Sequence, residues 1–388
     1  MPVTSSGASS LDPAETRTVT LFDERDPLVL ASGATLAPVE VAYETYGTLD
    51  ADRSNAVYVC HALTGDAHAA GARTPGRRPG WWDTMIGPGK PVDTDRLFVI
   101  SSNLLGGCNG TTGPSSPDPR TGRPYGLRFP SLVMRDLVTV HRALCRHLGV
   151  ERLRCVIGGS LGGMQALQWV LDAPDEIDAA VLACASSRLT AQNISFSEVA
   201  RQAIMRDPDF NGGDYYTTGR GPRNGLSVAR MTGHITYLSE QSMEQRFGRR
   251  LQHGGARPHG GLGLDFAVES YLHHQGDSFA DRFDANTYLY YTRVLDVFDP
   301  FPDEHAAVPA LAAARTRFLL LSFSSDWRFG TPHTQRIGRV LERNGVDVQQ
   351  HEVDSPYGHD SFLLDVPEYL GLVQDFVAGL GPSAISGE

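Results

Sequence analysis

The sequence predicts an α/β protein, in which a mostly parallel sheet is flanked by helices and interrupted by a helical insertion. Two observations predict this class. Apolar runs of strand length alternate with stretches of helical periodicity, and the alternation stops near residue 189 and resumes near residue 310. The 388 residues, 41% of them hydrophobic, suffice for a large core. We expect residues 1–188 and 310–388 to form that core, with residues 189–309 as the insertion.

Each element of the core follows from its local pattern. Short apolar runs bounded by turn residues predict strands, and continuous apolar runs indicate strands that are buried on both faces. Amphipathic spacing between these strands predicts helices that connect one parallel strand to the next. The predicted strands are residues 39–46, 56–60, 96–101, 153–157, 179–184, 317–322 and 349–353, and the predicted helices are residues 133–148, 163–171, 334–344 and 366–379.

The insertion carries helical spacing in place of strand patterns. We expect helices at residues 196–206, 229–239 and 266–275. Glycine-rich stretches at residues 211–225 and 254–263 separate them, and their composition is typical of connecting loops. The insertion is therefore expected to form a mobile lid rather than a second independent core.

Composition excludes several classes of function. The net charge is −11 and no basic run exceeds two residues, so a nucleic-acid partner is not expected. Lys90 is the only lysine and Pro91 follows it, which excludes a P-loop. No stretch reaches 18 apolar residues and the N-terminus lacks the pattern of a signal peptide, so we expect a soluble, cytoplasmic protein. The five cysteines are odd in number and widely spaced, which predicts buried free thiols.

A nucleophile motif stands between a predicted strand and a predicted helix. Residues 158–162 read G-G-S-L-G, which matches G-x-S-x-G with Ser160 at its centre. Such an elbow forces strained backbone angles on the serine and needs small residues around it. A glycine-rich helix start that binds nothing is the alternative, whereas a dinucleotide fingerprint is excluded because Ser160 replaces its second glycine. The strand–turn–helix context predicts a serine nucleophile.

A serine nucleophile requires an imidazole base and a carboxylate that orients the base. With this arrangement of strands, the expected chain order is serine, acid, histidine. Asp326 and His359 each follow a predicted strand, so both are expected at the sheet edge that carries Ser160. The competing candidates are His61, His351, Asp347 and Asp354.

Acyl transfer also needs donors for the oxyanion of the tetrahedral intermediate. On this kind of fold they are the backbone N–H after the nucleophile and one from an early strand-to-helix loop. The first is the N–H of Leu161. The loop at residues 61–66 follows a buried strand at the right place in the order, and we choose the N–H of Leu63 as the second.

Seven separated segments carry a resemblance to one family. They are residues 61–66 (HALTGD), 80–83 (GWWD), 103–116 (NLLGGCNGTTGPSS), 158–169 (GGSLGGMQALQW), 229–237 (ARMTGHITY), 284–288 (DANTY) and 358–360 (GHD). With these motifs, spread over about residues 41–376, the chain resembles the homoserine O-acyltransferases of methionine biosynthesis, which have the α/β-hydrolase fold. The resemblance implies transfer of an acyl group from acyl-CoA to the serine and then to the γ-hydroxyl of homoserine, without a metal or prosthetic group.

The resemblance also assigns roles to single residues. Ser160, Asp326 and His359 receive the triad roles that spacing predicts independently. The resemblance implies that Arg230 binds the homoserine carboxylate through the paired donors of its guanidinium, and that Asp360 binds the amino group. Without it, Arg230 would be interpreted as a surface helix arginine and Asp360 as a helix cap.

Arg328, two residues after Asp326 in the segment S-D-W-R-F, bears on the acyl donor. Family members that use succinyl-CoA resemble this segment, whereas acetyl-CoA users commonly carry a smaller or apolar residue at this place. Succinyl ends in a free carboxylate, and a charge-assisted bond to it is worth roughly 1.5–3 kcal/mol, or about 10- to 200-fold in selectivity. The alternative is that Arg328 pairs with a protein carboxylate and never meets the substrate.

The sequence therefore predicts a homoserine O-succinyltransferase with ping-pong kinetics, with succinyl-CoA as co-substrate and L-homoserine as acceptor. By analogy with the family, the helical insertion is expected to contribute the interface of a homodimer. Three rivals stay open: an acetyl-CoA-dependent enzyme of the same fold, a serine O-acyltransferase, and a simple esterase in which water replaces homoserine.

Overall fold

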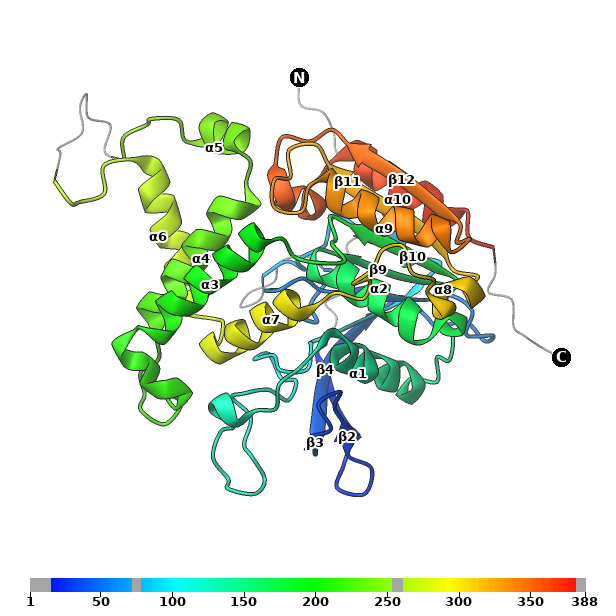
Figure 1. Cartoon of the computed structure of the whole chain (residues 1–388), viewed down its shortest axis with the longest axis horizontal. Coiled ribbons are helices and arrows are strands. Elements are labelled where there is room, and N and C mark those ends of the chain that lie inside the picture. The colour runs from blue at the N-terminus through cyan, green and yellow to red at the C-terminus, as the bar shows by residue number, and fades with distance from the viewer. Residues whose placement is uncertain (1–14, 72–77, 253–260, 382–388) are drawn as a thin grey trace.

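A sheet of eight strands forms the centre of the computed structural model, which describes residues 15–71, 78–252 and 261–381 (Figure 1). In order across the sheet, the strands are β1 (Arg17–Phe22), β4 (Val39–Tyr46), β8 (Phe98–Ser102), β5 (Ala56–Cys60), β9 (Cys155–Gly159), β10 (Ala179–Ala183), β11 (Arg317–Phe323) and β12 (Val348–Val353). The first two pairs are antiparallel and the remaining five are parallel. Two short ribbons are formed by β2 (Leu28–Val29) with β3 (Thr35–Leu36) and by β6 (Ile86–Gly87) with β7 (Val92–Asp93).

Helices cover both faces of the sheet. One face packs against α1 (Met134–His147), α2 (Leu161–Asp172), α8 (Pro309–Ala313) and α9 (Thr331–Arg343), and the other face packs against α10 (Pro367–Ala378). In β10, Ala180 and Leu182 join the core on the α2 side, while Ala179 and Val181 join the core on the α10 side. Because neither face of the central strands β5, β9, β10 and β11 meets water, these strands are apolar at most positions, whereas the edge strand β12 is polar and largely exposed.

The chain between β10 and β11 is helical. Its helices in the described residues are α3 (Ala191–Met205), α4 (Arg223–Tyr237), α5 (Glu240–Arg246), α6 (Ala267–Ala280) and α7 (Ala285–Val297), followed by the short α8 before β11. Short 3-10 turns occur at η1 (Gly126–Arg128), η2 (Pro174–Glu176), η3 (Pro208–Gly213) and η4 (Gly358–Leu363). Helices α3 to α6 lie to one side of the sheet and α7 runs back towards it (Figure 1). Most of the predicted loop at residues 254–263 lies outside the described residues.

The helices of the insertion differ in detail from the prediction. Helices α5 and α7 were not predicted, and α4 begins at Arg223, inside a stretch predicted as loop. Helix α7 is rich in Tyr, Thr and Val, which have lower helix propensity than Ala, Leu or Glu. It forms because Asp284 caps its start by accepting the N–H of Thr287 at 2.8 Å, and because Tyr291 and Val294 are buried against the core. Tertiary packing therefore outweighs local propensity here.

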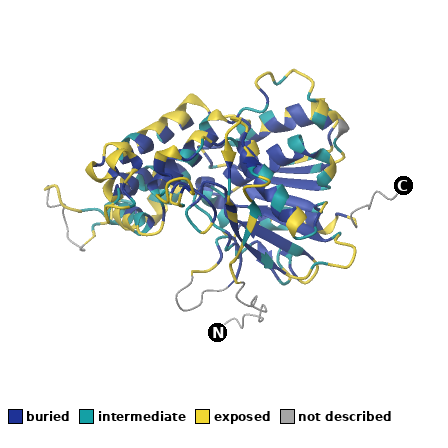
Figure 2. Ribbon diagram, turned by 90° about the horizontal axis from the view of Figure 1, so that it is seen from below, coloured by how far each residue is buried: buried dark blue, intermediate teal, exposed yellow. Residues whose placement is uncertain are grey.

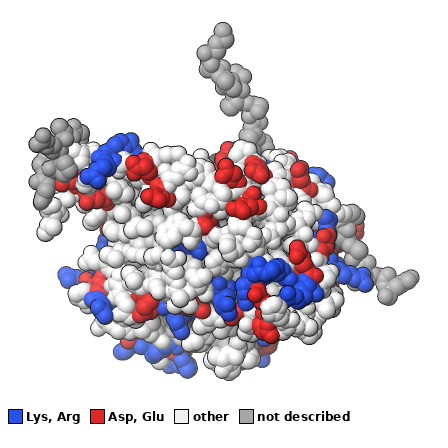
Figure 3. Space-filling view, turned by 45° about the horizontal axis from the view of Figure 1, so that its top comes forward, with Lys and Arg blue, Asp and Glu red and all other residues white. Residues whose placement is uncertain are grey.

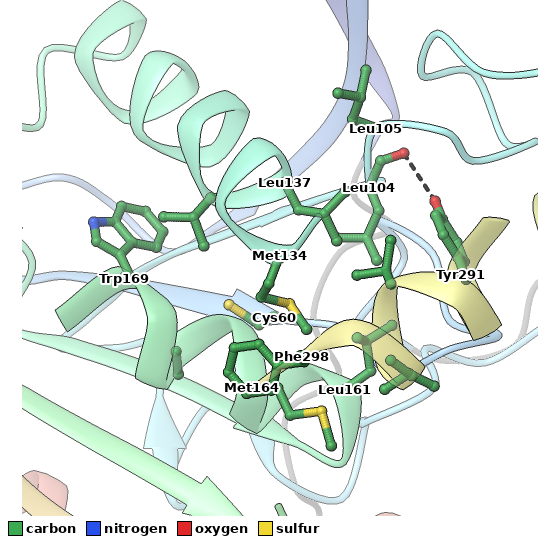
Figure 4. Close-up of a cluster of buried hydrophobic side chains, with 14 of the residues drawn as sticks. Cys60, Leu104, Leu105, Met134, Leu137, Leu161, Met164, Trp169, Tyr291 and Phe298 are labelled. Carbon is green, nitrogen blue, oxygen red and sulfur yellow. Dashed lines mark hydrogen bonds between the residues drawn. The ribbon is translucent and has the colours of Figure 1, made fainter. Parts of the chain in front are cut away.

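Buried apolar side chains below the start of α2 join the sheet, α1 and α7 into one cluster. Cys60 of β5 lies close to Leu161 and Met164 of α2, and all three are at most 1% exposed (Figure 4). The hydroxyl of Tyr291 on α7 donates to the carbonyl of Leu104 at 3.1 Å, which ties the insertion to the loop after β8. The start of α2 thus rests on a close-packed layer rather than on a mobile loop.

Apolar side chains are buried inside the molecule, and charged side chains of both signs lie on its surface. Figure 2 shows a continuous buried layer through the sheet and along the inner faces of the helices. Acidic and basic side chains are interspersed on the face drawn in Figure 3. None of the described helices is long and apolar enough to span a bilayer. All five cysteines are free thiols, and four of them are buried, namely Cys60, Cys145, Cys155 and Cys184.

Close backbone contact at Gly162 decides how the strand β9 meets the helix α2. A Cβ atom at Gly162 would lie 2.1 Å from the carbonyl oxygen of Cys60, so only glycine lets α2 approach the end of β5 this closely. We expect Gly162→Ala to lower the free energy of unfolding by ~1–3 kcal/mol, the range of overpacked cores, in urea unfolding followed by circular dichroism.

The matched control for Gly162→Ala is Gly371→Ala in α10, where an added Cβ would meet nothing within 4 Å. That change should raise the free energy of unfolding by ~0.5–1 kcal/mol, because alanine is the better helix former. Unchanged stability of Gly162→Ala would show that α2 can move away at little cost.

Candidate active site

Ser160 occupies a sharp turn between β9 and α2. Its φ of 57° and ψ of −123° place it in a region that side-chain-bearing residues rarely adopt. The N–H of Ser160 donates to the carbonyl of Ala183 at 2.9 Å, which anchors the turn to the end of β10. The strained angles direct the hydroxyl away from the helix axis, above the carboxyl ends of the parallel strands.

Ser160, His359 and Asp326 form a continuous hydrogen-bonded chain. His359 Nε2 lies 2.8 Å from Ser160 Oγ, and His359 Nδ1 lies 2.7 Å from Asp326 Oδ2. An ionised carboxylate can only accept, so Nδ1 carries the proton and Nε2 accepts the proton of the serine hydroxyl. The three residues come from the ends of β9, β11 and β12, which are parallel and end at the same edge of the sheet.

The carboxylate of Asp326 is held in its ionised form. Burial would by itself raise its pKa, but the facing His359 and the hydrogen bonds it accepts outweigh burial, so the pKa lies below its ordinary value. Oδ1 accepts the backbone N–H groups of Arg328 and Phe329, each at 2.9 Å. These bonds fix the orientation of the carboxylate, which in turn fixes the imidazole of His359.

The competing candidates from the sequence lie apart from Ser160. His351, Asp347 and Asp354 are exposed on or beside β12. Asp347 pairs with a neighbouring arginine at 3.2 Å, and Asp354 accepts from a serine hydroxyl at 2.7 Å. His61 is buried, and both of its ring nitrogens bond to the backbone. The structure therefore brings Asp326 and His359 to the serine, and none of the four competitors.

The two predicted oxyanion donors lie at the start of α2 and in the loop after β5. The N–H of Leu161 is at the first position of the helix, where no acceptor exists within the helix itself. Within the described ranges, no protein acceptor is recorded for the N–H of Leu63 or of Leu161. Neither N–H group is therefore committed to a backbone acceptor in the described residues.

Arg230 on α4 presents a guanidinium that lacks an acidic partner. Its charged group lies 4.8 Å from the centre of the Phe279 ring, and Nη1 is 3.4 Å from the hydroxyl of Thr64. The buried Nε atom has no hydrogen-bond partner, and no carboxylate of the described chain lies within 4.0 Å. A half-buried cation of this kind favours binding of an anionic group.

Asp360 stands beside His359 in the turn η4. Burial raises the pKa of its carboxyl, while the charges of His359 and Arg230 act in the opposite direction. A cationic ligand group next to Asp360 would stabilise the ionised form and so lower that pKa again. Arg230 and Asp360 therefore offer opposite charges near the triad, as the two ends of an amino acid require.

Arg328 also lies at the site without an acidic partner. Its Nη1 donates to the hydroxyl of Thr236 at 2.7 Å, and its charged group lies 5.2 Å from the centre of the Tyr237 ring. The side chain is 9% exposed, and the part of the chain described here places no carboxylate within 4.0 Å of it. Asn193 of α3 donates to the carbonyl of Arg328 at 2.9 Å and holds its backbone.

The chain is similar to a known family of proteins in both sequence and structure. A family model described as the alpha/beta hydrolase fold matches residues 55–366. The homoserine O-succinyltransferase of Magnetococcus marinus is 55% identical over 377 residues, which cover 95% of this chain and 95% of that protein. The homoserine O-acetyltransferase of Rhodospirillum rubrum is 52% identical over 355 residues, which cover 91% of this chain and 90% of that protein. The crystal structure of esterase E22 has a TM-score of 0.83 at 27% identity, and the match covers 94% of this chain and 100% of that one.

The chain belongs to the homoserine O-acyltransferase family. This confirms the family predicted from the seven segments, and with it the α/β-hydrolase fold. Relatives named for succinyl transfer and for acetyl transfer match at similar identity. The acyl donor is therefore a question for the residues at the site.

Tyr237 is a residue of this homoserine O-acyltransferase site that the sequence argument did not single out. Its ring centre lies 6.0 Å from the ring of His359, 5.2 Å from Arg328 and 5.9 Å from Arg230. It stands seven residues after Arg230, two turns along the same face of α4, so the helical period was the available signal. Both guanidinium groups therefore pack against one aromatic ring that also lies beside His359.

One group of metal-ligating residue types occurs near the triad in the described chain. Cys184, Asp326 and His359 bring one sulfur, one oxygen and one nitrogen within 4.8 Å of one another. The carboxylate of Asp326 and the imidazole of His359 already share a hydrogen bond. Burial raises the pKa of the Cys184 thiol well above its ordinary value. A metal ion would need a thiolate, so these residues fit a catalytic triad better than a metal centre.

We expect Asp326→Asn to slow the reaction of Ser160 with a fluorophosphonate by ~10³- to 10⁴-fold, as is typical when the triad carboxylate is neutralised. An amide can present its N–H to His359 and so stabilise the wrong tautomer. The labelling rate, followed by intact-mass spectrometry, measures this loss without any assumption about the natural substrate.

Asp354→Asn is the matched control for the triad acid, because Asp354 is exposed and bonds to a serine hydroxyl outside the triad. Its labelling rate should stay within twofold of the unmodified protein. Equal rates for the two variants would mean that Asp326 does not orient His359.

Proposed function

We propose that this protein is a homoserine O-succinyltransferase, which transfers succinyl from succinyl-CoA through a serine acyl-enzyme to L-homoserine. The observation that carries the choice of donor is the buried, unpaired guanidinium of Arg328 beside the triad. The family supports the homoserine O-acyltransferase reaction, and the charges of Arg230 and Asp360 suit an amino-acid acceptor. The products are O-succinyl-L-homoserine and CoA.

The first half-reaction acylates Ser160. Its Oγ attacks the thioester carbonyl while His359 Nε2 takes the hydroxyl proton, and the charge of Asp326 stabilises the imidazolium that results. The N–H groups of Leu63 and Leu161 donate to the oxyanion of the tetrahedral intermediate. The intermediate collapses, the C–S bond breaks, and His359 returns the proton to the departing CoA sulfur.

The second half-reaction transfers the acyl group to homoserine. The homoserine γ-hydroxyl gives its proton to His359 Nε2 and attacks the acyl carbon, and the bond to Ser160 Oγ then breaks as the serine regains that proton. Arg230 binds the carboxylate of homoserine and Asp360 binds its ammonium group. Two fixed charges at one end of the acceptor hold the hydroxyl at the ester, which favours homoserine over water.

Arg328 supports succinyl over acetyl as the acyl group. Burial of a guanidinium without a counter-charge is unfavourable, and the carboxylate at the end of a succinyl group would supply that charge. Acetyl has no such group, so it would leave the guanidinium unpaired. The alternative, in which Arg328 pairs with a protein carboxylate, has no support among the residues that the structure describes.

Two further properties belong to this proposal. A homodimer through the helical insertion is supported by the apolar side chains that α3 and α4 expose, namely Val199, Val228 and Ile235, which are 44–56% exposed. The cytoplasmic location remains a prediction from the sequence.

The donor and the acceptor are tested together by following thioester loss with succinyl-CoA or acetyl-CoA, with and without L-homoserine or L-serine. We expect thioester loss that is faster with succinyl-CoA and depends on homoserine, with O-succinylhomoserine identified by mass spectrometry. Ser160→Ala should form no acyl-enzyme and provides the blank. Rapid loss without any amino acid would instead indicate a hydrolase, and preference for acetyl-CoA would overturn the donor.

The role of Arg328 is tested by Arg328→Leu. We expect kcat/KM for succinyl-CoA to fall by ~10- to 200-fold, because a charge-assisted bond to the succinyl carboxylate is lost. The rate with acetyl-CoA should change by less than threefold. Arg142→Leu removes an arginine of α1 that pairs with Glu176 of η2, and it should leave the ratio of the two donors unchanged. Equal losses with both donors in Arg328→Leu would make Arg328 a structural residue.

A further inference from the structure

Gln165 on α2 is a fully buried polar residue that neither the triad nor the substrate-binding residues use. Its side chain is 0% exposed. The amide nitrogen Nε2 lies 3.0 Å from the carbonyl oxygen of His61 and 3.1 Å from the carbonyl oxygen of Leu161. One side chain therefore bridges the loop after β5 and the first turn of α2.

The neighbours of Gln165 determine which way its amide points. Two carbonyl oxygens face one end of the amide, so that end must be the NH₂ group, because an oxygen there would be repelled by both. The other end, Oε1, lies 3.0 Å from His141 Nε2, which must then carry a proton. His141 Nδ1 in turn accepts from the hydroxyl of Tyr58 at 2.8 Å.

His141 is suited to hold the amide in this orientation. It is 0% exposed, and burial lowers its pKa to about 4, so the ring stays neutral at physiological pH. Both of its nitrogens have partners, which leaves one tautomer. The His141–Tyr58 pair is fully buried and also bonds to Ser102 of β8, and Gln165 links it to the first turn of α2.

The two carbonyls that Gln165 binds belong to the segments that carry the proposed oxyanion donors. Leu161 supplies one donor itself. His61 starts the loop that holds Leu63, and its imidazole Nδ1 donates at 2.7 Å to the carbonyl of Ala62. That carbonyl belongs to the same peptide group as the N–H of Leu63, so His61 orients the second donor.

We propose that Gln165 is a positioning residue, which sets the spacing between the N–H groups of Leu63 and Leu161. This inference rests on the proposed acyl-transfer function. Two donors stabilise one oxyanion only when both come within about 2.7–3.1 Å of the same atom. The two segments are distant in sequence, and the Gln165 amide binds a carbonyl of each, so its loss would let the loop after β5 shift relative to α2.

Gln165→Met, which keeps the length of the side chain and removes both donors, is the main test. We expect kcat to fall by ~10- to 100-fold with KM for acyl-CoA and homoserine within twofold, because a shift of about 1 Å in catalytic groups has this effect. Acylation and transfer should slow by the same factor, since both pass through the oxyanion. The pH midpoint of the reaction should not move, because Gln165 does not touch His359.

Reaction with a fluorophosphonate separates this inference from the proposed function. The reagent needs neither CoA nor homoserine. When Ser160 attacks its phosphorus atom, negative charge still develops on an oxygen of the reagent. Its labelling rate should fall in Gln165→Met by the same factor as kcat, whichever acyl-CoA and acceptor the unmodified protein uses. A preference for acetyl-CoA would thus overturn the donor proposed above, but the labelling rate of Gln165→Met would still test the role of Gln165.

Gln168→Met is the matched control, because Gln168 lies on the same helix and bonds to Asp172 at its far end. It should keep kcat within twofold. A loss of kcat below threefold in Gln165→Met, a loss confined to KM, or an equal loss in Gln168→Met would overturn the inference.

A pair of changes at His141 keeps the inference testable if Gln165→Met does not fold. His141→Leu removes the donor that orients the Gln165 amide and should lower kcat by ~3- to 10-fold. His141→Gln places an amide N–H near the former Nε2 and should restore at least half of that loss. Equal activity of the two His141 variants would mean that the orientation of Gln165 is unimportant for catalysis.

Discussion

The close approach of α2 to the end of β5 is the constraint on which the rest of the site depends. Gly162 lies so near the carbonyl of Cys60 that any side chain would collide with it, and this contact permits the strained turn at Ser160. The turn raises the serine hydroxyl above the sheet edge. The same approach brings Leu161 and the loop at residues 61–66 close enough for one glutamine amide to bond to both.

Charge without a counter-charge is the second feature of the site. Arg230 and Arg328 both reach the triad region, and neither has a carboxylate of the described residues within 4.0 Å. Folded proteins seldom bury a cation unpaired, because the loss of hydration is unfavourable. Aromatic faces of Phe279 and Tyr237 offset part of that loss. In the function proposed above, the carboxylates of the substrates would offset the remaining part.

The order of charges along the site matches the two proposed substrates. Asp326 holds the imidazole of His359 at the centre, and Asp360 and Arg230 lie near it with opposite charges. Arg328 reaches Tyr237 from the loop after β11, whereas Arg230 reaches the same ring from within α4. In the function proposed above, an acyl group with a terminal carboxylate and an amino acid would therefore have separate cationic partners. This separation suits a reaction in which one site serves two substrates in turn.

Much of the catalytic arrangement could be predicted from the sequence because it depends on local order along the chain. The motif around Ser160, the parallel strands that end near Asp326 and His359, and the helical period that links Arg230 to Tyr237 are all one-dimensional patterns. Helix α7 was missed, since its aromatic and β-branched residues favour a helix only when they are buried.

The sequence by itself indicated the family, the candidate nucleophile Ser160, and the chain order in which a candidate acid and a candidate histidine follow it. Only the tertiary structure decided that Arg328 lacks an acidic partner, that the ring of Tyr237 contacts two arginines, and that Gln165 binds the carbonyls of His61 and Leu161. The reason is physical. The positions of strands, helices and motifs along the chain follow from patterns that repeat over a few residues, whereas the pairing of a buried polar group depends on atoms that distant segments bring to within about 3 Å.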